Sequence, residues 1–201
     1  MGRKLRISPM VALLFLGMLM IDESLLCLSV FLAAGFHELG HLCAARLLRI
    51  PVRSMKLDLL GARMELGGRP SYGQEAFVAA GGPLMSLVSG ALVYPWAAHP
   101  WATGPQGDGM TAAAVFCGAS VLLGLLNLLP VGTLDGGRML RCAVAGLWGD
   151  RAAVAVLRGT TAVCLGLLWM LSAYGLLRGG GFLSVFAFSL CLLGRTVCRE
   201  G

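Results

Sequence analysis

A short motif brings two histidines and a glutamate together in the sequence. Residues 36–41 read Phe-His-Glu-Leu-Gly-His, which contains the pattern H-E-x-x-H as His37, Glu38 and His41. In a helix this spacing puts both histidines on one face, one turn apart, where their rings can reach a single Zn²⁺ ion. Glu38 projects about 60° around the helix from His41, so it can accept a proton from a water beside the metal without being a ligand. The motif predicts a zinc site with Glu38 as a general base.

A third ligand is needed, because a catalytic zinc site generally has three protein ligands and an open position for water. Asp135 is the best candidate. It lies in the stretch from Asn127 to Gly137, where Pro130 and several glycines interrupt an apolar run and bend the chain. His41 is about eight residues, or roughly 12 Å of helix, from Arg49, and Asp135 begins at the same end, next to Arg138, from which it could turn inward. The two parts of the site are therefore expected at the same depth.

The composition indicates a membrane protein. Hydrophobic residues make up 57% of the 201 residues and charged residues only 13%, whereas a soluble domain has about 25% charged residues. The apolar residues fall in long runs, as membrane-spanning helices require. We expect an all-α polytopic membrane protein in which residues 1–201 form one membrane-embedded domain.

Six apolar stretches are candidate transmembrane helices. They cover residues 7–21, 24–48, 75–97, 111–129, 152–177 and 182–194. The basic start before residue 7 imitates a signal peptide, but no A-x-A-like cleavage site follows, so we expect an uncleaved first span. The motif with His37 lies inside the second span, where ionisable residues are costly and are expected for a function. The alternative is a buried, hydrogen-bonded cluster that serves helix packing.

The distribution of basic residues predicts the orientation in the membrane. Of the 16 Lys and Arg residues, all but Arg178 fall on one side if these stretches alternate across the bilayer. Positively charged loops are retained in the cytoplasm, so we expect both termini to be cytoplasmic, in a protein of the cell membrane. Residues 55–59 and 63–66 alternate apolar and polar side chains around Gly61, which predicts a small cytoplasmic β-hairpin after the second span.

Other functional classes fit the sequence less well. The net charge of +6 comes from basic residues at helix ends, not from one basic soluble face, which argues against nucleic acid as a partner. The seven cysteines contain no C-x-x-C pair, so neither a disulfide framework nor a thiolate zinc site is indicated. A membrane scaffold with a structural metal would need a fourth ligand, and none is evident. A metal transporter should carry ionisable residues on several spans, whereas the third, fifth and sixth have almost none inside.

The motifs resemble those of a known family, the site-2 protease family of intramembrane zinc metalloproteases, peptidase family M50. The resemblance covers nearly the whole chain and includes the HELGH motif, the N-x-x-P-x-x-x-x-D-G stretch, Gly81-Gly82-Pro83 and the hairpin. Six spans in this order look most like the branch of the sporulation protease that processes a membrane-tethered sigma factor precursor. We expect no C-terminal nucleotide-sensing domain of the kind common in that branch.

The resemblance implies a role for each matching residue. One zinc ion per chain would be held by His37, His41 and Asp135, with Glu38 as general base and Asn127 near the substrate or the oxyanion. The substrate would be a membrane-tethered or transmembrane protein in the lipid bilayer, and regulatory membrane partners or a homo-oligomer are compatible with it. Family members often carry an asparagine shortly after the Gly-Pro of the third span, where this chain has Ser86.

Overall fold

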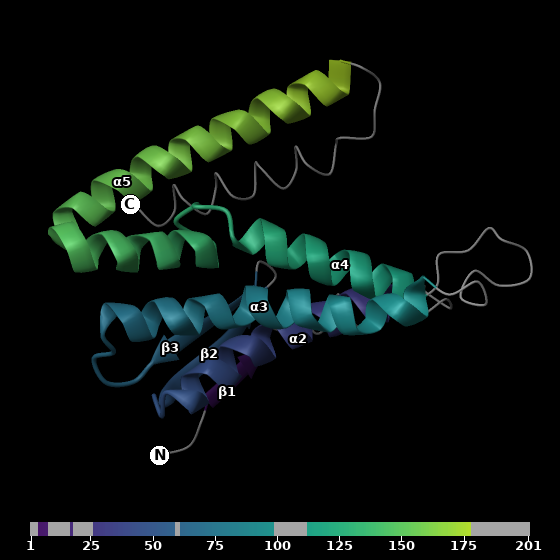
Figure 1. Ribbon diagram of the computed structural model, residues 1–201, viewed down its shortest axis with the longest axis horizontal. Helices are drawn as coiled ribbons and strands as arrows, with labels where there is room; N and C mark the ends of the chain where they lie inside the picture. The colour runs from purple at the N-terminus through teal and green to yellow at the C-terminus, as the bar shows by residue number, and fades with distance from the viewer. Residues whose placement is uncertain (1–3, 8–16, 18–25, 59–60, 99–111, 178–201) are drawn as a thin grey trace, which may run out of the picture. The chain divides into compact units, whose positions relative to one another are not determined.

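The structure is a computed structural model that describes residues 4–7, 17, 26–58, 61–98 and 112–177 (Figure 1). The chain is mostly helical and divides into two compact units, residues 1–126 and 127–201, each of which is considered by itself. The elements are β1 Lys4–Ile7, α2 Leu26–Leu47, β2 Val52–Asp58, β3 Gly61–Leu66, α3 Tyr72–Ala97, α4 Ala112–Asn127 and α5 Asp135–Leu177.

Three of the described helices, α2, α3 and α5, are long and apolar enough to cross a membrane. The expected spans at 24–48 and 75–97 correspond to α2 and α3 and are confirmed as helices. The stretch at 111–129 forms α4, an apolar helix of only 16 residues. The stretch at 182–194 lies outside the described residues. So does the stretch at 7–21, except for Ile7 and Gly17. Six spans and a single domain therefore stay predictions.

The helix expected at 152–177 corresponds to the part of α5 after a kink at Gly149, and the part before the kink was not predicted. The unpredicted part starts at Asp135 and meets the expected helix at Gly149, whose φ of 81° is a left-handed conformation that favours glycine. The sequence analysis assigned no helix to residues 135–151. Alanine, leucine, methionine and arginine dominate residues 138–148, and these residues favour a helix even where the segment is not apolar throughout.

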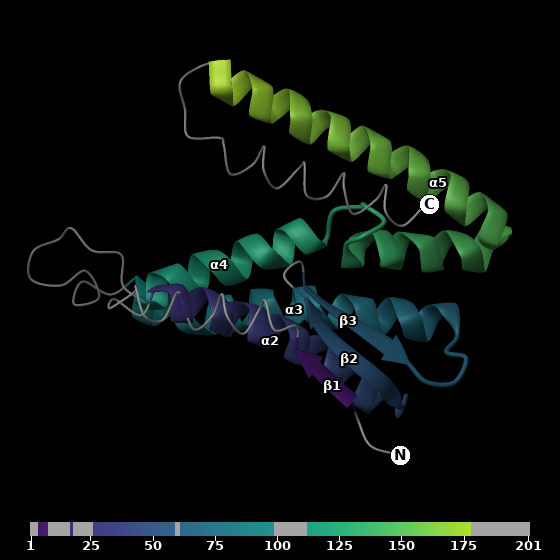
Figure 2. The same ribbon diagram turned by 180° about the vertical axis from the view of Figure 1, so that it is seen from behind.

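The hairpin after the second span is confirmed, but it belongs to a larger sheet. β2 pairs with β3 in antiparallel register up to Asp58 opposite Gly61, and β1 pairs with β2 in parallel register from Lys4 opposite Ser54 to Ile7 opposite Leu57 (Figure 2). The fold is thus helical with a three-stranded sheet of order β1-β2-β3, which corrects the expectation of a hairpin alone. Ile7 lies in β1 and not in the first span. A parallel pairing between segments this far apart in sequence leaves no local pattern to predict it.

In the first unit, α2 and α3 pack at backbone distance. A Cβ atom built on Gly81 would lie 2.6 Å from the carbonyl oxygen of Gly40 and 2.8 Å from Cβ of Ala44, and a Cβ on Gly40 would overlap the Gly81 carbonyl. Small residues at such a crossing let two membrane helices approach closely. Next to it lies a buried cluster that also packs against the sheet, namely Ala44, Ala45, Ile50 and Val78 with Val52, Met64 and Leu66 around them.

The start of α3 is fixed by a capping box. Ser71 Oγ accepts a hydrogen bond from the Gln74 amide at 3.3 Å, and the Gln74 side chain accepts one from the Ser71 amide at 2.9 Å. Two of the amides that a helix start leaves without partners are satisfied in this way. The register in which α3 faces α2 is therefore fixed by the crossing and by a defined helix start.

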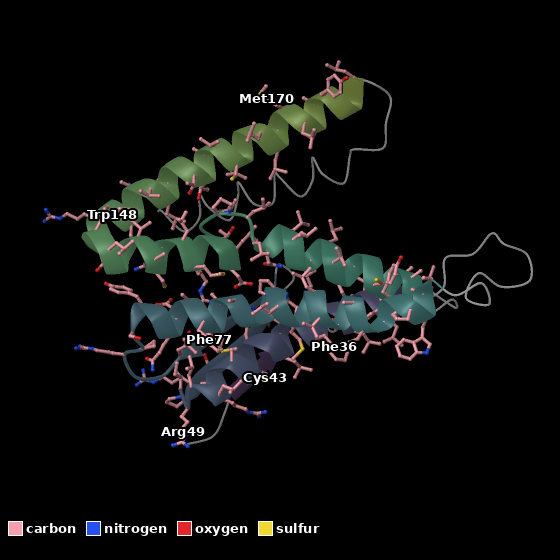
Figure 3. All side chains as sticks on the ribbon, viewed as in Figure 1. Phe36, Cys43, Arg49, Phe77, Trp148 and Met170 are labelled. Atoms are coloured by element: carbon pink, nitrogen blue, oxygen red, sulfur yellow. The ribbon has the colours of Figure 1, made fainter. Side chains whose placement is uncertain are left out.

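The outward faces of the helices carry large apolar side chains. Phe36 on α2, Phe77 on α3 and Trp148 and Met170 on α5 are all exposed on the protein (Figure 3). Exposed apolar residues on this scale mark contact with lipid or with another protein. Together with the apolar helices, they indicate an integral membrane protein.

Gly40→Ala tests the helix crossing. The added methyl group would collide with the Gly81 backbone, and such overpacking costs about 1–3 kcal/mol of stability. Gly35→Ala in the same helix is the matched control, because a Cβ there meets nothing within 4 Å, and alanine favours a helix by about 1 kcal/mol over glycine. We expect thermal unfolding in detergent, followed by circular dichroism, to show a lower midpoint for Gly40→Ala and an unchanged or higher one for Gly35→Ala. Equal midpoints would contradict the close crossing.

Candidate metal site

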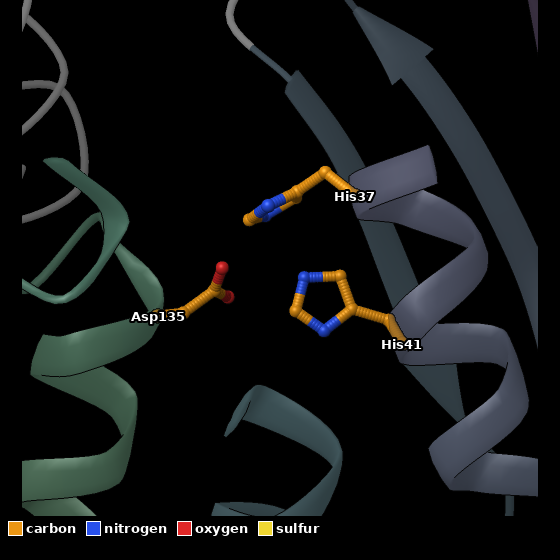
Figure 4. Close-up of side chains that lie close together, drawn as sticks. All are labelled: His37, His41 and Asp135. Atoms are coloured by element: carbon orange, nitrogen blue, oxygen red, sulfur yellow. The ribbon is translucent and has the colours of Figure 1, made fainter. Parts of the chain in front are cut away.

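The two histidines of the motif lie on consecutive turns of α2 and are both buried. His37 is 4% exposed and His41 7% exposed. Their ring centroids are 5.0 Å apart, and the ring planes are nearly perpendicular, at 82°. The expectation that the helical spacing puts both rings on one face is confirmed (Figure 4).

Both imidazoles are held by α3 through the same ring nitrogen. His41 Nδ1 lies 2.8 Å from the carbonyl oxygen of Val78, and His37 Nδ1 lies 2.9 Å from Oγ of Ser86. A carbonyl oxygen can only accept, so Nδ1 of His41 carries the proton and Nε2 keeps its lone pair. A second hydrogen bond of this type orients a histidine ring and leaves its other nitrogen available for a metal.

The Nε2 atoms of the two rings both lie beside Gly82. A Cβ atom built on Gly82 would touch Nε2 of His41 and lie 2.7 Å from Nε2 of His37. Any side chain at this position would fill the space in front of both nitrogens. The pair of imidazole donors, with both Nδ1 atoms already bonded, fits the coordination of a zinc ion.

Glu38 and Asn127 have been given catalytic roles by the sequence analysis, and these roles stay predictions. Glu38 follows His37 on α2 and is half-buried. Asn127 is the last residue of α4 and is also half-buried. Both side chains are therefore neither deep in the protein core nor fully exposed.

In the second unit, Asp135 is the first residue of α5 and is 8% exposed. A negative charge is favourable at this end of a helix, where the backbone amides point outwards. Nη1 of Arg138, one turn later, lies 4.0 Å from Oδ1 of Asp135, which is the outer limit of an ion pair. The carboxylate is thus held at a helix start, and its oxygens are of the type that can coordinate a metal ion.

The two glycines after Asp135 let the chain fold back tightly. A Cβ atom on Gly136 would lie 2.6 Å from the carbonyl oxygen of Leu129, and one on Gly137 would collide with the carbonyl of Val131. Residues larger than glycine therefore cannot occupy these positions without moving the backbone. The D-G-G sequence is explained by the close return of α5 onto the residues before it.

The second half of α5 supports the same turn. The amide of Gly132 donates a hydrogen bond of 3.0 Å to Oγ1 of Thr161. Val131 and Leu134 are buried against Leu165. Helix residues beyond the kink therefore hold the loop that ends at Asp135.

Sequence reasoning missed the contribution of α3. We had noted Ser86 only as a departure from the asparagine that relatives often carry. Val78, Gly82 and Ser86 are spaced by four residues and so share one face of the helix. That spacing was visible in the sequence, but no residue pattern shows which helix this face meets.

Comparison with known proteins agrees with this fold and motif. Residues 107–171 match the model of Peptidase family M50. The chain is 34% identical over 135 residues to the protein named "Putative zinc metalloprotease Rip3" in two strains of Mycobacterium tuberculosis; the match covers 66% of this chain and 34% of the relative. The chain thus spans about a third of the length of these curated relatives.

The similarity to solved structures concerns the fold. The site-2 protease from Methanocaldococcus jannaschii matches with a TM-score of 0.66 at 20% sequence identity, over 96% of this chain and 88% of that one. The fold is that of the site-2 proteases. In sequence, the chain is similar to peptidase family M50 over residues 107–171 and to zinc metalloproteases named as such.

Gly82→Ala tests whether the space in front of the two imidazoles holds a metal. The methyl group would press against Nε2 of both rings, so we expect zinc to bind at least about tenfold more weakly. Gly73→Ala in the same helix is the control, because a Cβ there meets nothing within 4 Å. Zinc affinity would be measured by competition with a chelator, and the metal-free unfolding midpoint would show that the variant is folded. Equal affinity in the two variants would mean that the metal does not bind there.

Proposed function

We propose that this protein is an intramembrane zinc metalloprotease that hydrolyses peptide bonds of membrane-associated protein substrates within or near the bilayer. The observation that carries the proposal is the pair of buried imidazoles on α2, whose Nδ1 atoms bond to α3 and whose Nε2 atoms share the space beside Gly82. The match of residues 107–171 to family M50 and the apolar helices support the same conclusion.

Asp135 is proposed as the third ligand. His37, His41 and Asp135 each offer one ligand atom to an ion (Figure 4), and two imidazoles with one carboxylate leave an open position, as in a catalytic site. A zinc ion bound there would supply a water of lowered pKa and would polarise the substrate carbonyl. One ion per chain is expected.

The proton transfers are assigned to Glu38. It follows His37 on α2, and helical geometry turns it about 60° from His41, so it is assigned to accept a proton from the attacking water. It then gives that proton to the leaving amine, which balances the hydrolysis. Asn127 is proposed to donate a hydrogen bond to the substrate carbonyl, where negative charge develops during the attack.

The cytoplasmic half of the membrane is the proposed side of cleavage. α2 ends with Arg46 in its last turn, and Arg49 follows it directly. Arg138 and Arg141 lie close behind Asp135 in the sequence. Because positive charges near membrane spans stay in the cytoplasm, both parts of the site belong to the cytoplasmic end of their helices. A substrate of this site is a transmembrane or membrane-tethered segment that can expose its backbone, and its product is released to the cytoplasm.

Glu38→Gln tests the base. The amide keeps the shape of the side chain but cannot accept the proton, so we expect cleavage to be lost while zinc and fold are kept. Glu75→Gln, in the first turn of α3, is the matched control and should cleave like the parent. Membrane and soluble proteomes of cells that express the parent and each variant would be compared. Proteins that appear shortened in the cytosol only with the parent and with Glu75→Gln are substrates. Parent-like cleavage by Glu38→Gln would exclude Glu38 as the base, and products on the outer side would exclude the proposed orientation.

Asp135→Ala tests the third ligand. Loss of one of three protein ligands should remove zinc or weaken its binding strongly. Asp150→Ala, which changes an exposed carboxylate of α5 beyond the kink, should retain the metal. Zinc per chain would be measured by atomic emission on purified protein. Full occupancy in Asp135→Ala would rule this residue out as a ligand.

A further inference from the structure

One face of α3 contacts both candidate metal ligands. Val78, Gly82 and Ser86 lie four residues apart on this face. Val78 meets His41, Ser86 meets His37, and Gly82 between them leaves space for the Nε2 atoms. Each imidazole is therefore oriented by a different kind of group on the same helix.

The two hydrogen bonds differ in whether they fix the position of the proton on the ring. The Val78 carbonyl only accepts, so it fixes the proton of His41 on Nδ1. The Ser86 hydroxyl can accept or donate, and it is the side-chain group that bonds to Nδ1 of His37, at 2.9 Å. Ser86 is 0% exposed, so this hydroxyl has little access to water as an alternative partner.

We propose that Ser86 is a positioning residue for His37: its hydroxyl accepts the Nδ1 proton and so directs the Nε2 lone pair to the metal. The inference rests on the proposed function, since it assigns a role toward the same ion. Groups that orient metal-binding histidines in this way typically change metal affinity about 10–100-fold when they are removed.

A buried serine can also serve packing alone, and the chain offers a control for that role. Ser120 on α4 is 0% exposed as well, but its hydroxyl has no hydrogen-bond partner among the described residues. Ser86→Ala and Ser120→Ala therefore delete the same atom from equally buried positions of the first unit. They differ in whether that atom bonds to a histidine.

The first experiment measures zinc affinity of the purified full chain by chelator competition. We expect Ser86→Ala to bind zinc about 10–100-fold more weakly and Ser120→Ala to bind like the parent. His37→Ala is measured alongside. If His37→Ala binds like the parent, the proposed metal site fails. If His37→Ala is weakened while Ser86→Ala stays within about twofold of the parent, the positioning role fails on its own, since the expected effect is at least tenfold.

The second experiment needs no metal. The chain has only three histidines, so the ring nitrogens of metal-free, ¹⁵N-histidine-labelled protein give a simple NMR spectrum from which each tautomer is read at a pH where the rings are neutral. In Ser86→Ala we expect His37 to lose its preference for the Nδ1 proton, while His41, bonded to a backbone carbonyl, keeps its own and shows that α2 and α3 still pack.

Ser86→Thr keeps the hydroxyl and should give the parent pattern for His37. An unchanged His37 tautomer in Ser86→Ala, or a Ser86→Thr spectrum that matches that of Ser86→Ala, would overturn the proposal.

Discussion

The approach of α2 and α3 at the Gly40 and Gly81 crossing is the constraint on which the histidine pair depends. Because neither helix has a side chain there, the backbones meet. Only at that distance can the carbonyl of Val78 and the hydroxyl of Ser86 bond to rings on the neighbouring helix. The same packing buries the rings, which would be costly for polar groups that lacked partners. The hydrogen bonds to the two rings therefore depend on the glycines at the crossing.

The carboxylate is positioned in the second unit by different means. Asp135 depends on a turn in which two glycines permit backbone contact and Thr161 holds a loop amide. The turn has no regular secondary structure of its own before α5. Its order comes from burial of Val131 and Leu134 against the far half of the helix. A long helix with a kink at Gly149 therefore stabilises the loop from which it begins.

The sequence could predict the features that residues close together in the chain determine. The spacing of His37 and His41 defines a helix face by itself, the apolar runs define α2 and α3, and the alternation around Gly61 defines the hairpin. Pairing of β1 with β2 was not predicted because it joins segments about 50 residues apart in the chain, and four residues carry too little pattern to suggest a partner. The part of α5 before the kink was missed because Asp135, Arg138 and Arg141 interrupt its apolar residues. The role of Ser86 was missed because it depends on the register between two helices, which no single helix encodes.

The two histidines also differ in whether a substitution can remove the group that orients the ring. The group that orients His41 is a main-chain carbonyl, which every amino acid at position 78 would supply as long as the helix keeps its path. The group that orients His37 is a side chain, and a single codon change at position 86 can remove or replace it. Natural variants should therefore be able to adjust the environment of the first ring independently of the second.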